Sequence, residues 1–235
     1  MNLLLSLSGP RVIELLDYSR TTGPVRDVMM MRMEPGVCNF HEILCKAFEE
    51  DNVNSNFQRY YTTEILECIN SLHKYEIIHR DIKPGNFVLS PLTGRLKLID
   101  LGTSRKLTSE GSYVTQLTDL RCSPNYVSPE FVSDMSRLKL LPGVYTFKAQ
   151  IDTRTDVWSA GVVFYKMANH GVSPFEHLKD HLDKACEISN LSKAVPLLDS
   201  TGQNPVFDDF LAKCLSKDIS SRLSVPELLS HPYLA

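Results

Sequence analysis

The feature that most constrains this chain is a polar loop held between short apolar segments. Residues 77–89 read Ile-Ile-His-Arg-Asp-Ile-Lys-Pro-Gly-Asn-Phe-Val-Leu, and residues 96–102 read Leu-Lys-Leu-Ile-Asp-Leu-Gly after a Thr93-Gly94 turn. Short apolar runs bounded by turn residues predict strands. The chain must therefore present the polar groups of this loop between strands that are anchored in its core.

The polar groups of the loop are suited to phosphate chemistry. An acid, a lysine and an amide stand at Asp81, Lys83 and Asn86, and a second acid, Asp100, ends the next predicted strand. Oxygen ligands of this kind can hold Mg²⁺ and its bound phosphates over a hydroxyl nucleophile. The alternative is a connection whose side chains only form turns and caps. We favour the chemical interpretation because the groups occur together in the strand context that it requires.

These two stretches resemble the H-R-D-x-x-x-x-N catalytic loop and the D-F-G metal-binding loop of eukaryotic protein kinases, with Asp-Leu-Gly at residues 100–102. The resemblance implies that Asp81 orients the hydroxyl and accepts its proton, and that Lys83 supplies charge to the transferred phosphoryl group. It implies that Asn86 and Asp100 hold Mg²⁺ and that ATP is the phosphoryl donor. The Asp-x-Lys-Pro-x-Asn spacing is similar to the serine/threonine-type loop.

Later residues extend the resemblance over essentially the whole chain. Tyr-Val-Ser-Pro-Glu at residues 126–130 is similar to the A-P-E element. The resemblance implies that Ser123 contacts Asp81 and Lys83. It also implies two supporting contacts: Glu130 pairs with Arg222, and Asp156 braces the catalytic loop. Each residue alone has an ordinary alternative, such as a helix cap or a solvated charge.

The polar stretch at residues 103–127 is long enough to indicate a functional connection. Arg80, beside the catalytic acid, can receive a phosphate on this segment through charge-assisted hydrogen bonds. The candidate acceptors are Ser109, Ser112, Thr115 and Thr118. A hydroxyl-rich exposed loop without modification is the alternative.

Residues 31–36 (Met-Arg-Met-Glu-Pro-Gly) and 226–233 (Pro-Glu-Leu-Leu-Ser-His-Pro-Tyr) resemble the monopolar spindle dual-specificity kinases, the spindle-checkpoint branch of the family. The resemblance makes Met33 the gatekeeper and implies that the Glu34 carbonyl and the Gly36 amide face adenine. Asn39 completes the predicted nucleotide-binding set. The function implied is ATP-dependent phosphorylation of Ser and Thr on protein substrates, with Tyr as a further acceptor.

The expected fold is α+β and protein kinase-like, with a mostly helical C-terminal lobe and a remnant of the N-terminal β-lobe. Residues 1–33 would be that remnant (the end of a helix, then a hairpin), 34–40 the hinge, and 41–235 the C-terminal lobe. The hairpin strands are expected at 12–16 and 28–33. Apolar periodicity and caps predict helices over residues 57–75, 156–167, 176–188 and 206–216, and one starting near Ser224.

Two motifs of complete kinases have no counterpart in residues 1–235. There is no G-x-G-x-x-G before residue 36 and no V-A-I-K strand. The sequence could be part of a longer kinase, a short product that binds without transferring phosphate, or a chain completed by another. We expect little or no activity from residues 1–235 alone, and an inactive, pseudokinase-like interaction module is the alternative function.

The charge and cysteine content exclude several other classes. Scattered charges and a net charge of −3 predict neither a nucleic-acid surface nor a basic membrane anchor. The six cysteines show no C-x-x-C spacing, so we expect reduced thiols. No apolar run reaches the length of a membrane span or resembles a signal peptide. We therefore expect a cytoplasmic or nuclear protein whose partners are ATP and protein substrates.

Overall fold

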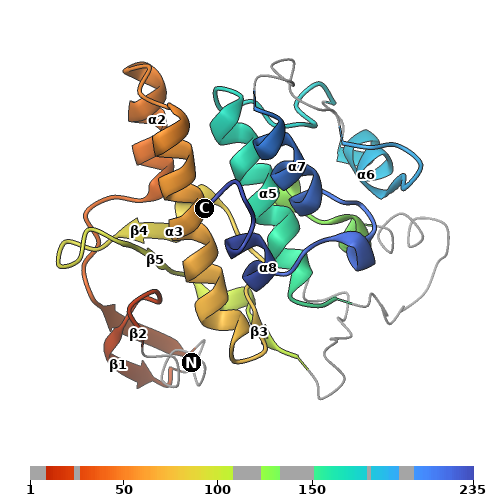
Figure 1. The fold of residues 1–235 in the computed structure, drawn as a ribbon. Coiled ribbons are helices and arrows are strands. Elements are labelled where there is room, and N and C mark those ends of the chain that lie inside the picture. Colours follow the sequence, from red (N-terminus) through yellow and green to blue (C-terminus); the bar gives the residue numbers. More distant parts are fainter. Residues whose placement is uncertain (1–8, 24–26, 108–122, 133–150, 179–180, 196–203) are drawn as a thin grey trace, which may run out of the picture.

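Two central helices organise the chain. The computed structural model describes residues 9–23, 27–107, 123–132, 151–178, 181–195 and 204–235. In Figure 1, α3 (Ser55–His73) and α5 (Arg154–Ala168) run side by side, with α7 (Pro205–Cys214) and α8 (Val225–Leu229) packed around them. The predicted mostly helical lobe is therefore present, and it carries the main hydrophobic core.

Helix α5 is the most deeply buried element, as its nearly continuous apolar sequence predicts. Gly161 lets α7 approach closely, because a Cβ atom there would lie 2.8 Å from the Cβ of Cys214. After the helix ends, Gly171 takes a φ of 86° and donates its N–H to the Lys166 carbonyl. The chain therefore leaves the helix through a conformation that glycine adopts without strain.

Helix α2 (Phe40–Glu49) was not predicted as a separate element. Its start is fixed by a capping box in which the Asn39 side chain accepts from the Glu42 N–H and the Glu42 carboxylate accepts from the Asn39 N–H. The buried side chains of Phe40, Leu44 and Ala47 attach it to the core. The Asn-x-x-Glu pattern was the signal in the sequence that could have revealed this helix.

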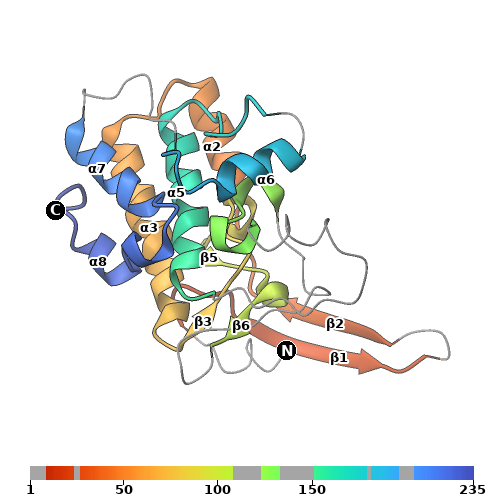
Figure 2. The ribbon, with the colours of Figure 1, turned by 90° about the vertical axis from the view of Figure 1, so that its right-hand side faces the viewer.

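The predicted hairpin is present, but its first strand lies further along the chain. β1 (Leu15–Thr21) pairs antiparallel with β2 (Val28–Met33), whereas the strand was expected at residues 12–16. The expectation failed because Val12 and Ile13 are buried against a different sheet. Figure 2 shows the two-stranded ribbon projecting away from the helices. Apart from Leu15, every residue of β1 and β2 is exposed.

The predicted strands around the polar loop are confirmed. β4 (Phe87–Leu89) and β5 (Leu96–Leu98) form an antiparallel pair, and Val12 bridges to Leu98 on its free side. β3 (Ile77–Ile78) pairs with β6 (Arg105–Lys106), which closes the loop from its other end. These short pairings fix both ends of the segment that carries the candidate site.

The other expectations have mixed outcomes. The last helix starts after Ser224 with the predicted capping box. Helix α6 (His181–Ser189) begins five residues later than expected, because residues 174–177 form a turn.

The proposed helix end at residues 1–8 and the four candidate phosphoacceptors lie outside the described residues. The domain boundaries at 33 and 40 stay a prediction. Among the described helices, none is long and apolar enough to cross a membrane.

Candidate active site

The polar loop is held from behind by a buried carboxylate on α5. Asp156 accepts hydrogen bonds from the backbone N–H groups of His79 and Arg80, both at 2.8 Å. The His73 Nε2 atom lies 2.9 Å from the same carboxylate. Arg80 has a φ of 71°, a conformation that is strained for a bulky residue and that these bonds hold in place. The predicted bracing role of Asp156 is therefore confirmed as a contact.

The charge on Asp156 persists despite complete burial. Burial acts to raise the pKa of this carboxyl, but the bonds and charges of His73 and His79 outweigh it and lower the pKa. An ionised carboxylate at this position can serve several donors at once. It therefore links α3, the loop and α5 through a single side chain.

Asp81 lies at the centre of a compact polar cluster. Its carboxylate accepts from Lys83 Nζ at 2.6 Å, from Ser123 Oγ at 2.8 Å and from Asn86 Nδ2 at 3.0 Å. Burial acts to raise its pKa, but the hydrogen bonds from Lys83, Ser123 and Asn86 outweigh burial and lower it. Asp81 is therefore a carboxylate at neutral pH and can accept a hydrogen bond from a hydroxyl.

The predicted contact between Ser123 and the loop is present. Lys83 Nζ donates to Ser123 Oγ at 2.9 Å while it also donates to Asp81. Ser123 is thereby joined to Lys83 of the loop across 40 positions of sequence. Asp81, Lys83 and Ser123, predicted together, lie together.

Asn86 and Asp100 lie at the edge of the sheet where β4 begins and β5 ends. The Asn86 Nδ2 atom donates to the Asp81 carbonyl at 2.7 Å as well as to its side chain. In the part of the chain that the structure describes, the Asn86 amide oxygen accepts no side-chain or backbone hydrogen bond and can meet another ligand. Asp100 takes φ 60° and ψ 66°, and its exposed carboxylate accepts only the Gly102 N–H among the described residues. Leu101 is buried in the core, as expected for the apolar residue of this motif.

The predicted nucleotide-binding residues follow β2. Met33 ends that strand with an exposed side chain. Within the described residues, neither the Glu34 carbonyl nor the Gly36 amide makes a backbone hydrogen bond, so both can meet a ligand. Gly36 packs on Val88, whose Cβ would lie 3.0 Å from a Cβ atom at position 36. The side chain of Asn39 caps α2, a structural role that the sequence reasoning missed.

Sequence reasoning also missed the ion pair that holds this connecting segment. The Glu34 carboxylate is bound by Lys97 Nζ on β5 and accepts the backbone N–H of Glu14. Both side chains of the ion pair are about nine-tenths buried. Lys97 stands only three residues before Asp100, so the pair connects the nucleotide-facing backbone to the strand that carries Asp100. No local pattern around Lys97 indicates this partner.

The predicted pair between Glu130 and Arg222 is confirmed. Arg222 Nη1 and Nη2 donate to the two carboxylate oxygens at 2.9 and 3.0 Å. The guanidinium is fully buried, lies over the Trp158 ring and also donates to the carbonyls of Ser216 and Arg154. A bidentate pair with this many partners fixes residues 128–132 against the helical lobe.

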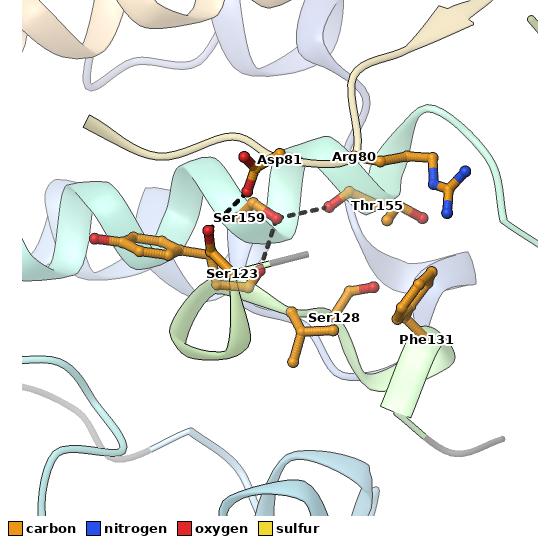
Figure 3. Close-up of a pocket in the computed structure, with 9 residues that line it drawn as sticks. Arg80, Asp81, Ser123, Ser128, Phe131, Thr155 and Ser159 are labelled. Carbon is orange, nitrogen blue, oxygen red and sulfur yellow. Dashed lines mark hydrogen bonds between the residues drawn. The ribbon is translucent and has the colours of Figure 1, made fainter. Parts of the chain in front are cut away.

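A small cavity is lined by Asp81 and Ser123 (Figure 3). Its volume is about 20 Å³, so it admits a water molecule and nothing larger. Arg80 lies at one side with its guanidinium 5.8 Å from the centre of the Phe131 ring. Ser159 Oγ, which also lines the cavity, donates to the Tyr126 carbonyl at 2.7 Å. The cavity is therefore too small to be a substrate pocket.

Comparisons with known proteins cover nearly all of the chain. The family model described as "Protein kinase domain" matches residues 1–234. Dual specificity protein kinase TTK of Mus musculus is 30% identical over 224 residues, covering 95% of this chain and 24% of that protein. Serine/threonine-protein kinase mph1 of Schizosaccharomyces pombe is 31% identical over 248 residues, covering 99% and 35%. Serine/threonine-protein kinase MPS1 of Saccharomyces cerevisiae is 29% identical, covering 95% and 29%. The chain thus spans about a third or less of these relatives.

Proposed function

The chain belongs to the protein kinase family, and from this premise we propose that its site serves ATP-dependent phosphoryl transfer to Ser and Thr hydroxyls of protein substrates. The observation that carries the proposal is the cluster in which Asp81 is bonded by Lys83, Ser123 and Asn86. Family membership supports ATP and Mg²⁺ as the reagents. The relatives named dual specificity kinases support Tyr as a further acceptor.

Asp81 has the role of orienting the substrate hydroxyl in this proposal. Its lowered pKa keeps it ionised but makes it a weak base, so it accepts a hydrogen bond first and the proton as transfer proceeds. Lys83 lies 2.6 Å from Asp81 and supplies a positive charge beside the same position. Ser123 fixes the second oxygen of the carboxylate and so limits its rotation.

The metal-binding proposal rests on the donor atoms of Asn86 and Asp100. An amide oxygen and a carboxylate are ligands that Mg²⁺ prefers, and Mg²⁺ in such sites takes few protein ligands together with phosphate oxygens and water. Among the described residues there is no group of three or more His, Cys, Asp or Glu side chains that could hold a metal. A Mg²⁺ ion that takes Asn86 and Asp100 as its two protein ligands, and phosphate oxygens and water as the others, fits this donor set. Bound Mg²⁺ would neutralise the phosphate charge.

The nucleotide base is assigned to the segment after β2. The Glu34 carbonyl and the Gly36 amide supply an acceptor and a donor for the adenine edge, and Met33 limits the space beside them. The Lys97–Glu34 ion pair supports this backbone from behind. Asn39 is retained in the proposal only by its position at the border of the base site, since its side chain caps α2 and its backbone N–H donates to Glu42.

A second candidate function is a binding module without transfer activity. The described part of the chain contains only two paired strands above the site, and their residues are exposed. Residues 1–235 hold no Gly-rich loop or V-A-I-K lysine to clamp phosphates. For this chain alone we expect weak or absent transfer. Kinship with TTK and MPS1 kinases supports a spindle-checkpoint role, and we retain a cytoplasmic or nuclear location.

One pair of experiments separates these functions. Thermal-shift titration with ATP should show binding that requires Mg²⁺, and Asp100→Asn should weaken it. A phosphotransfer assay on a generic Ser/Thr substrate should give little turnover, with Asp81→Asn as control. Substantial turnover that Asp81→Asn abolishes would refute the inactive alternative. The absence of any Mg²⁺-dependent nucleotide binding would refute the assignment of Asn86 and Asp100.

A further inference from the structure

A shallow groove on the outer face of α3 carries an excess of positive charge. Its volume is about 270 Å³, and its lining includes Arg59, Tyr60 and Glu64 of α3, Arg95 directly before β5, and Leu234. We call these five residues the basic groove. We propose that the basic groove binds an acidic peptide segment of a partner protein.

The charge of the groove follows from how Glu64 is shared. Its buried carboxylate is bound by Arg11 through two nitrogens and by Arg95 Nη1 at 2.8 Å. It also accepts the Leu96 N–H at 2.9 Å. Burial acts to raise the pKa of Glu64, but these bonds lower it, so the carboxylate stays charged. Two arginines therefore share one acid that is already fully bonded.

Arg59 adds a further positive charge without an acidic partner in the described part of the chain. Its guanidinium lies 5.8 Å from the centre of the Tyr233 ring, which holds the exposed side chain beside the groove. Restricting the side chain before binding reduces the entropy lost when a carboxylate is bound. Arg95 is 54% exposed, so its other nitrogens can also reach a ligand.

The groove matches a peptide that carries apolar as well as acidic side chains. Tyr60 is 44% exposed, and its hydroxyl lies 3.4 Å from the Gly94 carbonyl. Its ring packs on Tyr61 in an edge arrangement at 5.0 Å, so part of the ring stays accessible to a ligand. Leu234 borders the same space. Arginine clusters beside an apolar surface are a common arrangement for recognising acidic motifs. Charge complementarity therefore selects glutamate- or aspartate-rich segments with an apolar residue between the acids.

The groove is separate from the site proposed for phosphoryl transfer. Arg59 lies 14 residues before His73 on α3, which is about 21 Å along the helix axis at 1.5 Å per residue. The His73 end of the helix is the one that contacts the loop through Asp156. Peptide binding in the groove can therefore be measured without reference to phosphoryl transfer.

The test is fluorescence anisotropy with a fluorescein-labelled peptide of sequence Glu-Glu-Leu-Glu-Glu and a Lys-Lys-Leu-Lys-Lys control. We expect binding of the acidic peptide alone, weakened by salt, and about fivefold weaker with Arg59→Gln, as for an exposed ion pair. The matched control, Lys46→Gln on α2, removes the same charge from a side chain that is 74% exposed and should leave affinity unchanged. Asp81→Asn should bind the peptide normally.

Two results would overturn the proposal. One is equal binding of the acidic and basic peptides, or no binding of either, by the folded chain. The other is equal affinity of Arg59→Gln and the unsubstituted chain.

Discussion

Replacing Asp156 by Asn tests whether one buried carboxylate holds the catalytic loop. The substitution preserves size and removes the charge. Asp156 accepts three hydrogen bonds, two of them from the backbone N–H groups of His79 and Arg80, which lie on different carboxylate oxygens. An Asn side chain has one accepting oxygen, so at least one of these N–H groups would face an NH₂ group and lose its acceptor.

The magnitude follows from this loss. A hydrogen bond to a charged group contributes about 1.5–3 kcal/mol, and a buried N–H left without an acceptor adds a desolvation cost of similar size. We expect Asp156→Asn to lower the free energy of unfolding by about 3 kcal/mol or more. Asp17→Asn is the matched control, because Asp17 pairs with Arg32 at the surface, where both side chains are about 70% exposed, and should cost less than about 1 kcal/mol.

Urea denaturation followed by tryptophan fluorescence measures both variants. Trp158 is the single tryptophan of the chain and is fully buried on α5, two residues from Asp156. Hydrogen exchange at His79 and Arg80 gives a local readout, and both amides should exchange faster in Asp156→Asn. Equal stabilities of the two variants, with unchanged exchange at both amides, would refute the reasoning.

The pH dependence follows from the sign of the pKa shift. Asp156 has a lowered pKa in the folded state, so its contribution is complete above the ordinary value of about 3.9 and is lost as pH falls through the lower folded value. The stability gap between the unsubstituted chain and Asp156→Asn should therefore shrink as pH falls below the ordinary value of about 3.9. A gap that stays the same in strong acid would contradict this assignment.

Three further predictions concern packing, the Lys97–Glu34 pair and the thiols. Gly161→Ala should lower the free energy of unfolding by about 1–3 kcal/mol in urea denaturation, because its methyl group would meet the Cβ of Cys214 at 2.8 Å; an unchanged midpoint would contradict this. Lys97→Met should destabilise the chain by about 3 kcal/mol by leaving Glu34 with a buried, uncompensated charge, and adding Glu34→Gln should recover part of the loss. A thiol reagent should modify exposed Cys45 quickly in the native chain but Cys214 only on unfolding, because burial raises the pKa of the Cys214 thiol; rapid modification of Cys214 by mass spectrometry would show that α7 opens.

The site could be predicted further than the fold around it. Asp81, Lys83 and Asn86 stand within six residues, so one local sequence pattern was enough to predict that they act together. The contacts of Ser123, Asp156 and Arg222 were predicted from the family resemblance, and the structure contains each of them. Residues that act together can be predicted from the sequence when they follow one another in the order and spacing of a known family.

Contacts made by charged side chains across long sequence separations left no such signal. Glu64 joins Arg11 across 53 positions, and neither residue stands in a pattern that names the other. The first strand was placed too early because Val12 looks like the start of an apolar strand, whereas it is buried against β5. The strand that forms, Leu15–Thr21, contains Asp, Ser and Arg, because its faces are not covered by the described residues.

The exposed ribbon of β1 and β2 gives the chain an uneven sensitivity to oxidants. The chain has seven methionines, and four of them lie on β2 and are at least 41% exposed: Met29, Met30, Met31 and Met33. Met167 on α5 is buried and shielded. Peroxide converts an accessible thioether to a polar sulfoxide. Mild oxidation would therefore turn the apolar border of the predicted nucleotide site into a polar one, while the buried Met167 of the helical core would stay unoxidised.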